Sequence, residues 1–114
     1  MKITIGLPTF NEEKNTGNIV NELKKKYESI IVCDDGSTDS TYEILEDLDV
    51  EIIKHEKNMG YGAAINSIFK KSQEIGSDIL VTFDADGQHK IEDIETVIAP
   101  IIAVSYTHLR AHET

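Results

Sequence analysis

The sequence predicts an α/β fold, a doubly wound parallel sheet with flanking helices. Short apolar runs alternate with longer amphipathic runs along the 114 residues, which is the order expected of a parallel sheet whose crossovers are helical. The runs at 30–33 and 79–81 are continuously apolar, as in strands covered on both faces. Polar, turn-rich segments follow three of the expected strands, where ligands bind in open α/β sheets.

Four strands and four helices are expected. The strands are Ile3–Leu7, Ser29–Asp34, Val50–Lys54 and Asp78–Phe83. Apolar residues at helical spacing predict helices over 19–27, 42–48 and 63–69, and a fourth from 90 toward 98. Ser40 with Glu43 three residues later predicts a capping box at the second helix.

Composition narrows the classes of function. The net charge of -10 argues against a nucleic-acid partner, because phosphate binding needs clustered Lys and Arg. The longest apolar stretch, Val97–Val104, contains Pro100 and is shorter than the about 20 residues of a membrane span. The first strand is expected to begin at once, so no signal peptide is predicted ahead of it. Cys33 is the single cysteine, so we expect a packed, inert thiol and a cytoplasmic location.

Two acids follow the last expected strand. Asp84 and Asp86 are two residues apart in Asp84-Ala85-Asp86-Gly87-Gln88-His89, so an extended chain presents both carboxylates on one side. Like charges this close repel unless a cation lies between them, and Mg²⁺ or Mn²⁺ with a diphosphate suits such a pair. Gln88 can add a carbonyl oxygen, whereas His89 is a phosphate contact or a turn residue. The pair indicates an enzyme that handles a diphosphate through a metal.

The segment after the first strand has two interpretations. Pro8 fixes the exit from the strand, Phe10 can stack on a base, and Asn11 and Glu12 can accept hydrogen bonds from base or ribose. The alternative is a turn whose polar residues cap the next helix.

The segment after the second strand is Asp34-Asp35-Gly36-Ser37-Thr38-Asp39. Adjacent acids at a strand end point in different directions, so one of them at most meets a given ligand atom. Either a carboxylate accepts from a base N–H or a ribose hydroxyl, or Ser37 and Asp39 satisfy helix N–H groups. Both hold if Asp35 is on the ligand and Asp39 caps.

The third polar segment joins the third strand to the next helix. Gly60 and Gly62 permit close backbone approach, and the helix N-terminus can face a phosphate. The alternative is a plain loop-to-helix junction. His55 has no acidic neighbour in the sequence and receives no role.

Together these segments resemble the family 2 glycosyltransferases with a GT-A fold. The matching segments are 7–13, 34–39, 58–66 and 84–89, and the last is most similar to the branch of dolichyl- and undecaprenyl-phosphate sugar transferases. Phe10 stands where the family usually has Tyr, which keeps the ring and loses its hydroxyl.

The resemblance implies a UDP- or GDP-linked sugar donor and, in that branch, a polyprenyl phosphate acceptor. It implies donor-binding residues Pro8, Phe10, Glu12, Asp35, Asp84, Ala85 and Gln88, and metal ligands Asp84, Asp86 and Gln88 for Mg²⁺ or Mn²⁺. The metal would neutralise charge on the departing nucleoside diphosphate. The catalytic base is expected in a second half of the domain.

The resemblance covers roughly residues 1–103, about half of such a domain. We therefore expect 1–103 to be the nucleotide-sugar-binding half, and full-length protein at the cytoplasmic face of the membrane. Ser105–Thr114 looks like a translated sequencing adapter, and residues 104–114 are expected to be non-native. Two alternatives are a catalytically inactive nucleotide-binding fragment and a nucleotidyltransferase. The segment after the first strand lacks the Gly-rich, basic loop that nucleotidyltransferases usually need.

Overall fold

Seven helices and strands alternate along the part of the chain that the structure describes. The structure is a computed structural model, and it describes residues 2–83. The elements are β1 (Ile3–Thr9), α1 (Thr16–Lys26), β2 (Ser29–Asp34), α2 (Thr41–Glu46), β3 (Glu51–Lys54), α3 (Tyr61–Glu74) and β4 (Ile79–Thr82). The predicted fourth helix lies outside the described residues.

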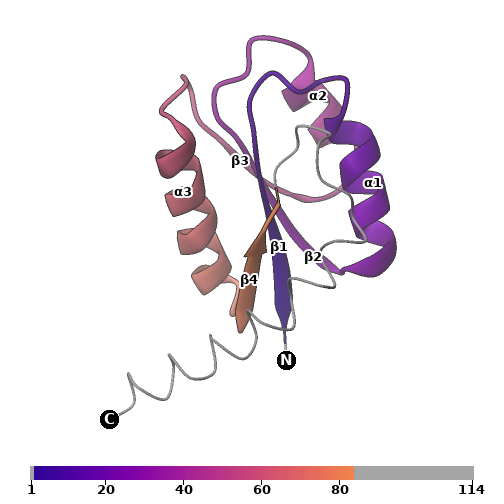
Figure 1. Ribbon diagram of the computed structural model, residues 1–114, viewed down its shortest axis with the longest axis vertical. Coiled ribbons are helices and arrows are strands. Elements are labelled where there is room, and N and C mark those ends of the chain that lie inside the picture. The colour runs from indigo at the N-terminus through magenta and orange to yellow at the C-terminus, as the bar shows by residue number, and fades with distance from the viewer. Residues whose placement is uncertain (1, 84–114) are drawn as a thin grey trace.

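The strands form one parallel sheet in the order β3-β2-β1-β4. Strands β2 and β3 follow one another on one side of β1, and β4 pairs with the other side of β1 (Figure 1). The strand order therefore reverses between β1 and β4. In open α/β sheets, this reversal at the carboxyl ends of the strands is where ligands bind.

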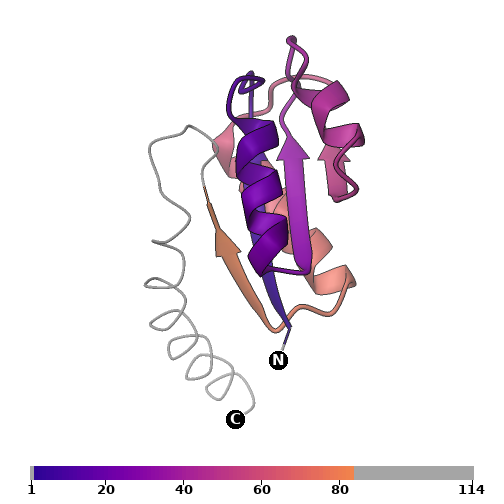
Figure 2. The ribbon, with the colours of Figure 1, turned by 90° about the vertical axis from the view of Figure 1, so that its right-hand side faces the viewer.

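Both faces of the sheet are covered, which confirms the predicted doubly wound architecture. Helices α1 and α2 cover one face and α3 covers the other (Figures 1 and 2). Successive residues of β2 point to opposite faces. Ile30 and Val32 join one core cluster, and Ile31 and Cys33 join the cluster beneath α3. These continuously apolar strands are therefore buried on both sides.

Helix α3 approaches the centre of the sheet closely at Gly6. A Cβ atom there would lie 2.5 Å from Ile68 Cγ2, so the absence of a side chain lets α3 pack on β1. Cys33 lies fully buried beneath the same helix. Burial, followed by the charges of Asp35 and Asp34, raises the pKa of its thiol to about 12. The prediction of a packed, inert thiol is confirmed.

The predicted capping box at α2 is wrong. Ser40 is the N-cap residue, but its side chain makes no capping hydrogen bond. Asp39 Oδ1 instead accepts from the backbone N–H of Thr41 at 2.9 Å. The Asp39 carboxylate therefore satisfies an N–H in the first turn of α2. This was the capping role that one interpretation of residues 34–39 expected for Asp39.

No helix within residues 2–83 is long and apolar enough to cross a membrane.

Candidate functional site

The loops that follow β1, β2 and β3 meet at the carboxyl edge of the sheet, at the top of Figure 1. Pro8 is buried inside β1, in register with Cys33, rather than at the exit from the strand. Phe10 follows β1 and is 42% exposed. Glu12 is half-buried in the next loop, and Asp35 directly follows β2.

The predicted residues of the last segment, Asp84, Ala85, Asp86 and Gln88, lie outside the described residues. The description ends at Phe83, whose N–H donates to Gly6 O at 2.8 Å. Across residues 2–83, no three His, Cys, Asp or Glu side chains form a group that could hold a metal ion.

Asn11 ties the first loop to the second. Its side-chain Oδ1 accepts from the backbone N–H groups of Thr38 at 2.8 Å and Asp39 at 3.3 Å. Its own N–H donates to Ser37 Oγ at 2.9 Å. Asn11 adopts a left-handed φ of 51°, a region that Asn tolerates better than most residues. Ser37 therefore binds the neighbouring loop, and the suggestion that it satisfies a helix N–H is wrong.

Glu12 contributes to the same contact between loops. Its N–H donates to Thr41 Oγ1 at 3.1 Å, and its Oε2 accepts from Asn15 Nδ2 at 3.2 Å. Its carbonyl accepts from the N–H of Thr16, the first residue of α1, at 2.9 Å. Glu12 thus shapes the turn into α1, as the alternative interpretation held, and its carboxylate retains acceptor capacity.

The Asp35 carboxylate joins the loop after β2 to the segment after β3 through three hydrogen bonds. Its Oδ1 lies 2.7 Å from His55 Nδ1 and accepts from Met59 N at 2.9 Å, while Oδ2 accepts from Gly60 N at 2.9 Å. Burial alone would raise the pKa of Asp35, but the hydrogen bonds from these three residues outweigh it and hold the pKa below its usual value. Asp35 is therefore a fixed, ionised carboxylate at neutral pH.

Asp34 binds a different partner from Asp35. This agrees with the expectation that adjacent acids at the end of a strand point in different directions. Its Oδ1 accepts from Ser37 N at 3.1 Å. Its Oδ2 is buried and has no hydrogen-bond partner among the described residues. Asp34 thus supports its own loop, whereas Asp35 holds the loop after β3.

Gly36 allows these two loops to touch through their backbones. It has a φ of +76°, and a Cβ atom would lie 2.3 Å from the carbonyl carbon of Lys57. Together with the bonds of Asp35 to residues 59 and 60, this contact fixes the segment that leads into α3. Residues 58–62 thus form a loop-to-helix junction, which was one of the two predictions for this segment.

His55 is the site residue that the sequence analysis missed. It follows β3, and its imidazole bridges Asp35 Oδ1 at 2.7 Å and Ser67 Oγ of α3 at 2.9 Å. The register between β2 and β3 could have predicted the contact between His55 and Asp35. Asp34 pairs with Lys54, so the residues that follow them, Asp35 and His55, are neighbours at the sheet edge.

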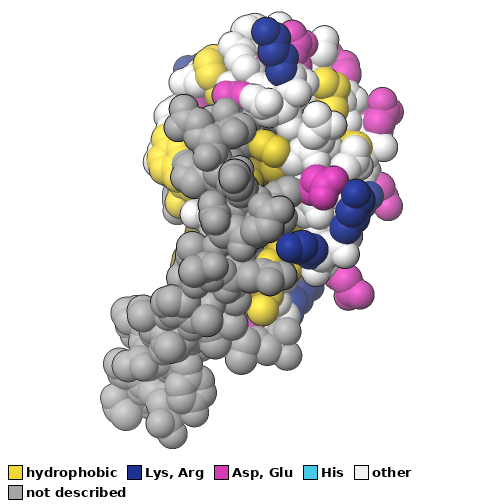
Figure 3. Space-filling model, turned by 45° about the vertical axis from the view of Figure 1, so that its right-hand side comes forward, with side chains coloured by type: hydrophobic (Ala, Val, Ile, Leu, Met, Phe, Trp, Pro, Cys, Tyr) yellow, Lys and Arg dark blue, Asp and Glu magenta, His cyan; other side chains and the backbone are white. Residues whose placement is uncertain are grey.

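Apolar side chains are exposed around this edge. Besides Phe10, Met59 is 58% exposed and Tyr61 is 61% exposed, and both lie at the start of α3. Elsewhere, acidic and basic side chains are interspersed over the face drawn in Figure 3. An exposed aromatic ring beside a fixed carboxylate offers a flat base both a stacking surface and a hydrogen-bond acceptor.

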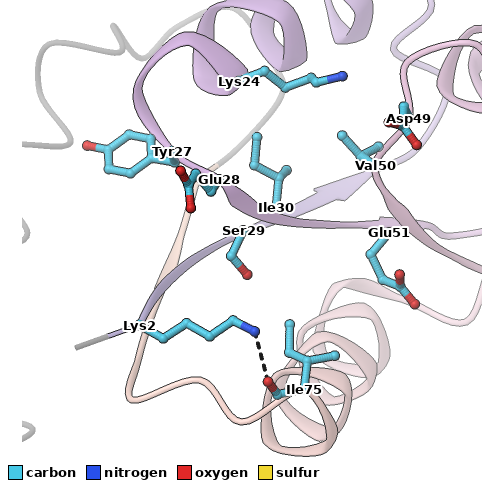
Figure 4. A pocket seen from close by; sticks show the side chains of 10 residues that line it. All are labelled: Lys2, Lys24, Tyr27, Glu28, Ser29, Ile30, Asp49, Val50, Glu51 and Ile75. Carbon is cyan, nitrogen blue, oxygen red and sulfur yellow. Dashed lines mark hydrogen bonds between the residues drawn. The ribbon is translucent and has the colours of Figure 1, made fainter.

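A cavity lies at the opposite edge of the sheet, near the amino ends of β1 and β2 (Figure 4). Lys2 and Lys24 line it, but their ammonium groups donate to the backbone carbonyls of Ile75 and Leu48. Glu28, Asp49 and Glu51 add negative charge. This mixed lining lies away from the carboxyl ends of the strands, and the candidate site is at the other edge.

Comparison with known proteins gives the family. The family model described as glycosyl transferase family 2 matches residues 4–107. The chain belongs to glycosyl transferase family 2. This membership confirms the resemblance that the four polar segments carried.

Two relatives within the family are informative. The UDP-N-acetylglucosamine–dolichyl-phosphate N-acetylglucosaminyltransferase of Methanococcus voltae is 46% identical over 84% of this chain and 45% of its own length. The dolichol-phosphate mannosyltransferase of Pyrococcus furiosus is 35% identical over 89% of this chain and 30% of its own. The chain thus spans less than half the length of either relative.

Solved structures give the fold. Glucosyl-3-phosphoglycerate synthase of Mycobacterium tuberculosis, in complex with Mn²⁺, UDP and glucosyl-3-phosphoglycerate, matches with a TM-score of 0.62. The match is 24% identical and covers 75% of this chain and 33% of that one. The same enzyme has been crystallised with Mg²⁺ and UDP. The predicted GT-A sheet is confirmed by this likeness.

Proposed function

We propose that the intact protein transfers a sugar from a UDP- or GDP-linked donor to a polyprenyl phosphate. The observation that carries this proposal is the ionised Asp35 carboxylate, fixed at the carboxyl edge of the sheet in a family 2 chain. The acceptor is proposed from the named activities of the M. voltae and P. furiosus relatives, which both use dolichyl phosphate.

Asp35 selects the base by accepting a ring N–H. Only one hydrogen bond is given to its Oδ2 by residues 2–83, from Gly60 N, and a carboxylate oxygen can accept two. Uracil and guanine carry a ring N–H at their pairing edge, whereas cytosine and adenine present a bare nitrogen. A carboxylate would repel that nitrogen, and sites built to bond an N–H strongly reject analogues that lack it.

Phe10, Pro8 and Glu12 complete the nucleoside site in this proposal. The exposed Phe10 ring stacks on the base, and buried Pro8 fixes the strand from which the loop leaves. The remaining acceptor capacity of the Glu12 carboxylate suits a ribose hydroxyl. Phe10 and Glu12 belong to the loop after β1, and Asp35 belongs to the loop after β2. Asn11 holds these two loops together.

Asp84, Ala85, Asp86 and Gln88 are proposed to face the diphosphate, with Asp84, Asp86 and Gln88 as ligands of Mg²⁺ or Mn²⁺. Oxygen ligands suit either ion, and the crystals of the structurally similar synthase with Mn²⁺ or Mg²⁺ and UDP support a divalent metal beside the diphosphate. When bound, the metal supplies positive charge that stabilises the leaving diphosphate. The base that activates the acceptor, where one is needed, lies elsewhere in the protein.

Residues 1–103 are proposed to be the donor-binding part of a longer domain, and 104–114 to be non-native. The partial coverage of the relatives supports a longer domain. It also favours a second candidate function for the 114-residue chain alone, namely binding of the nucleotide without transfer.

The experiment is sugar transfer by the intact protein. Purified protein is incubated with UDP- or GDP-linked sugars, Mn²⁺ and a short polyprenyl phosphate, and product is detected by mass spectrometry. We expect transfer by the wild type and its loss in Asp86→Ala, whereas the exposed Asp47→Ala retains wild-type turnover. Turnover unchanged in Asp86→Ala would refute the metal assignment, and absence of transfer with every donor would refute the proposed activity.

A further inference from the structure

We propose that His55 is the positioning residue that determines which oxygen of Asp35 is open to the nucleotide base. This inference rests on the proposed donor-binding role of Asp35. It assigns to His55 a part in base selectivity, through Asp35, without contact between the imidazole and the donor.

The imidazole of His55 is held at both nitrogens. Its side chain is 10% exposed and that of Asp35 is 6% exposed. An ionised carboxylate only accepts hydrogen bonds, so Nδ1 carries a proton and donates it to Asp35 Oδ1 at 2.7 Å. Nε2 lies 2.9 Å from Ser67 Oγ, whose hydroxyl can donate to a neutral ring or accept from a charged one. The Nδ1–H bond to Asp35 is therefore kept in both charge states.

Among residues 2–83, Asp35 is the one ionised group that is hydrogen-bonded to the His55 ring. Cys33 Sγ lies 3.7 Å from Nε2, and its buried thiol stays protonated. The backbone of His55 is also anchored, since its N–H donates to Asp34 O at 2.9 Å. Strand β3 and helix α3 thus fix the ring from two sides, and the ring fixes Asp35.

The consequence is an asymmetric carboxylate. Oδ1 receives two hydrogen bonds, from His55 Nδ1 and Met59 N, which fill its two lone pairs. From residues 2–83, Oδ2 receives one, from Gly60 N. Without His55, Oδ1 would regain an open lone pair, and the carboxylate would no longer present a single acceptor in a single direction. Discrimination between bases with and without a ring N–H depends on that direction.

The test compares two substitutions at position 55 in the intact protein. The Nδ2 atom of Asn is bonded to Cγ, as Nδ1 is in His, and it carries N–H donors. His55→Asn therefore keeps the hydrogen bond to Asp35, whereas His55→Leu removes it. The readout is the ratio of dissociation constants, CDP over UDP and ADP over GDP, measured by calorimetry with Mn²⁺. A general loss of folding lowers the active fraction for all four nucleotides and does not move these ratios.

We expect the larger ratio to fall by about tenfold in His55→Leu, as for a lost hydrogen bond to a charged group, and to stay within about threefold of wild type in His55→Asn. Ser72→Ala is the matched control. It removes a buried hydroxyl of α3, the helix that also carries Ser67, and this hydroxyl donates to Phe69 O. The substitution should leave the ratios of dissociation constants unchanged. A wild-type ratio in His55→Leu, or an equal fall in His55→Asn, would overturn the inference.

Two further measurements keep the inference separable from the function. If Asp35→Asn loses discrimination while His55→Leu keeps it, the role of His55 is refuted and that of Asp35 stands. If the wild type shows no discrimination, the base-selecting role of Asp35 itself is refuted. Should His55→Leu fail to fold, ¹⁵N NMR of the wild type decides, since a ring with a bare Nδ1 would contradict the proposal.

Discussion

At the residue scale, Asp35 shows how a buried charge is retained. Burial disfavours the ionised form, and three hydrogen bonds outweigh that effect and lower the pKa. A carboxyl group whose pKa is lower in the folded protein stabilises the fold above its unfolded pKa of about 3.9. That stabilisation is lost as the pH falls through the folded pKa. Asp35 therefore links its proposed role in donor recognition to the stability of the fold in acid.

We expect Asp35→Asn to lower the free energy of unfolding by about 2 kcal/mol at pH 7, the scale of hydrogen bonds to a charged group. As the pH falls below about 4 and through the lowered pKa of Asp35, wild type should lose the stability contributed by Asp35 and approach the variant. Denaturant unfolding across this range measures the difference. The exposed Asp47→Asn is the control, and a difference from wild type that stayed constant with pH would contradict the account.

Gly36 provides a second residue-scale prediction, with a built-in control at Gly76. Both have a φ near +77°, but only at Gly36 would a Cβ meet backbone, 2.3 Å from Lys57 C. Gly76→Ala should cost about 1 kcal/mol for the left-handed conformation. Gly36→Ala should cost about 2 kcal/mol more, because neither backbone can yield. Equal costs in chemical denaturation would show that the loops do not touch.

At the element scale, the strands could be predicted because parallel strands buried on both faces leave continuous apolar runs. The strand predicted over Ser29–Asp34 has the same bounds as β2. β1 extends through Pro8 to Thr9, past the expected end at Leu7. Pro8 lies two residues beyond Gly6, the last β1 residue in described register with β4. A proline in a strand is tolerated where the ladder on one side needs no N–H.

The contacts between loops could not be predicted from local patterns. Asn11 meets residues 27 and 28 positions away, and His55 meets Asp35 across 20. Local patterns offered both Ser40 and Asp39 as caps of α2, because both precede the helix, and only the fold decides which side chain reaches it. Strand register supplies this missing information, since it fixes which loop residues become neighbours.

Asn11 gives the element-scale prediction. Asn11→Ala removes the acceptor for the N–H groups of Thr38 and Asp39 and places Ala at a φ of 51°. We expect the amide hydrogens of these two residues to exchange at least about tenfold faster, which corresponds to about 1.4 kcal/mol of lost protection. NMR hydrogen exchange measures this. The exposed Asn18→Ala should leave both rates unaltered, and unchanged protection in Asn11→Ala would show that the loops are held by other contacts.

At the scale of the whole molecule, sheet topology brings the site together. The order β3-β2-β1-β4 places the reversal of strand order beside β1, and the loops after β1, β2 and β3 are bonded to one another at that edge. The alternation of apolar and amphipathic runs predicted a doubly wound parallel sheet but not the strand order, and family 2 membership agrees with that fold. The metal ligands remain a prediction from the sequence, because Asp84 and its neighbours follow the last described residue.

The most direct measurement is a crystal structure of the intact protein grown with Mn²⁺ and the nucleoside diphosphate that it prefers. The account predicts a ring N–H of the base about 3 Å from Asp35 Oδ2, Phe10 stacked on the base, and an anomalous manganese peak beside Asp84 and Asp86. A nucleotide bound at the opposite edge of the sheet, or a base that avoids Asp35, would contradict it.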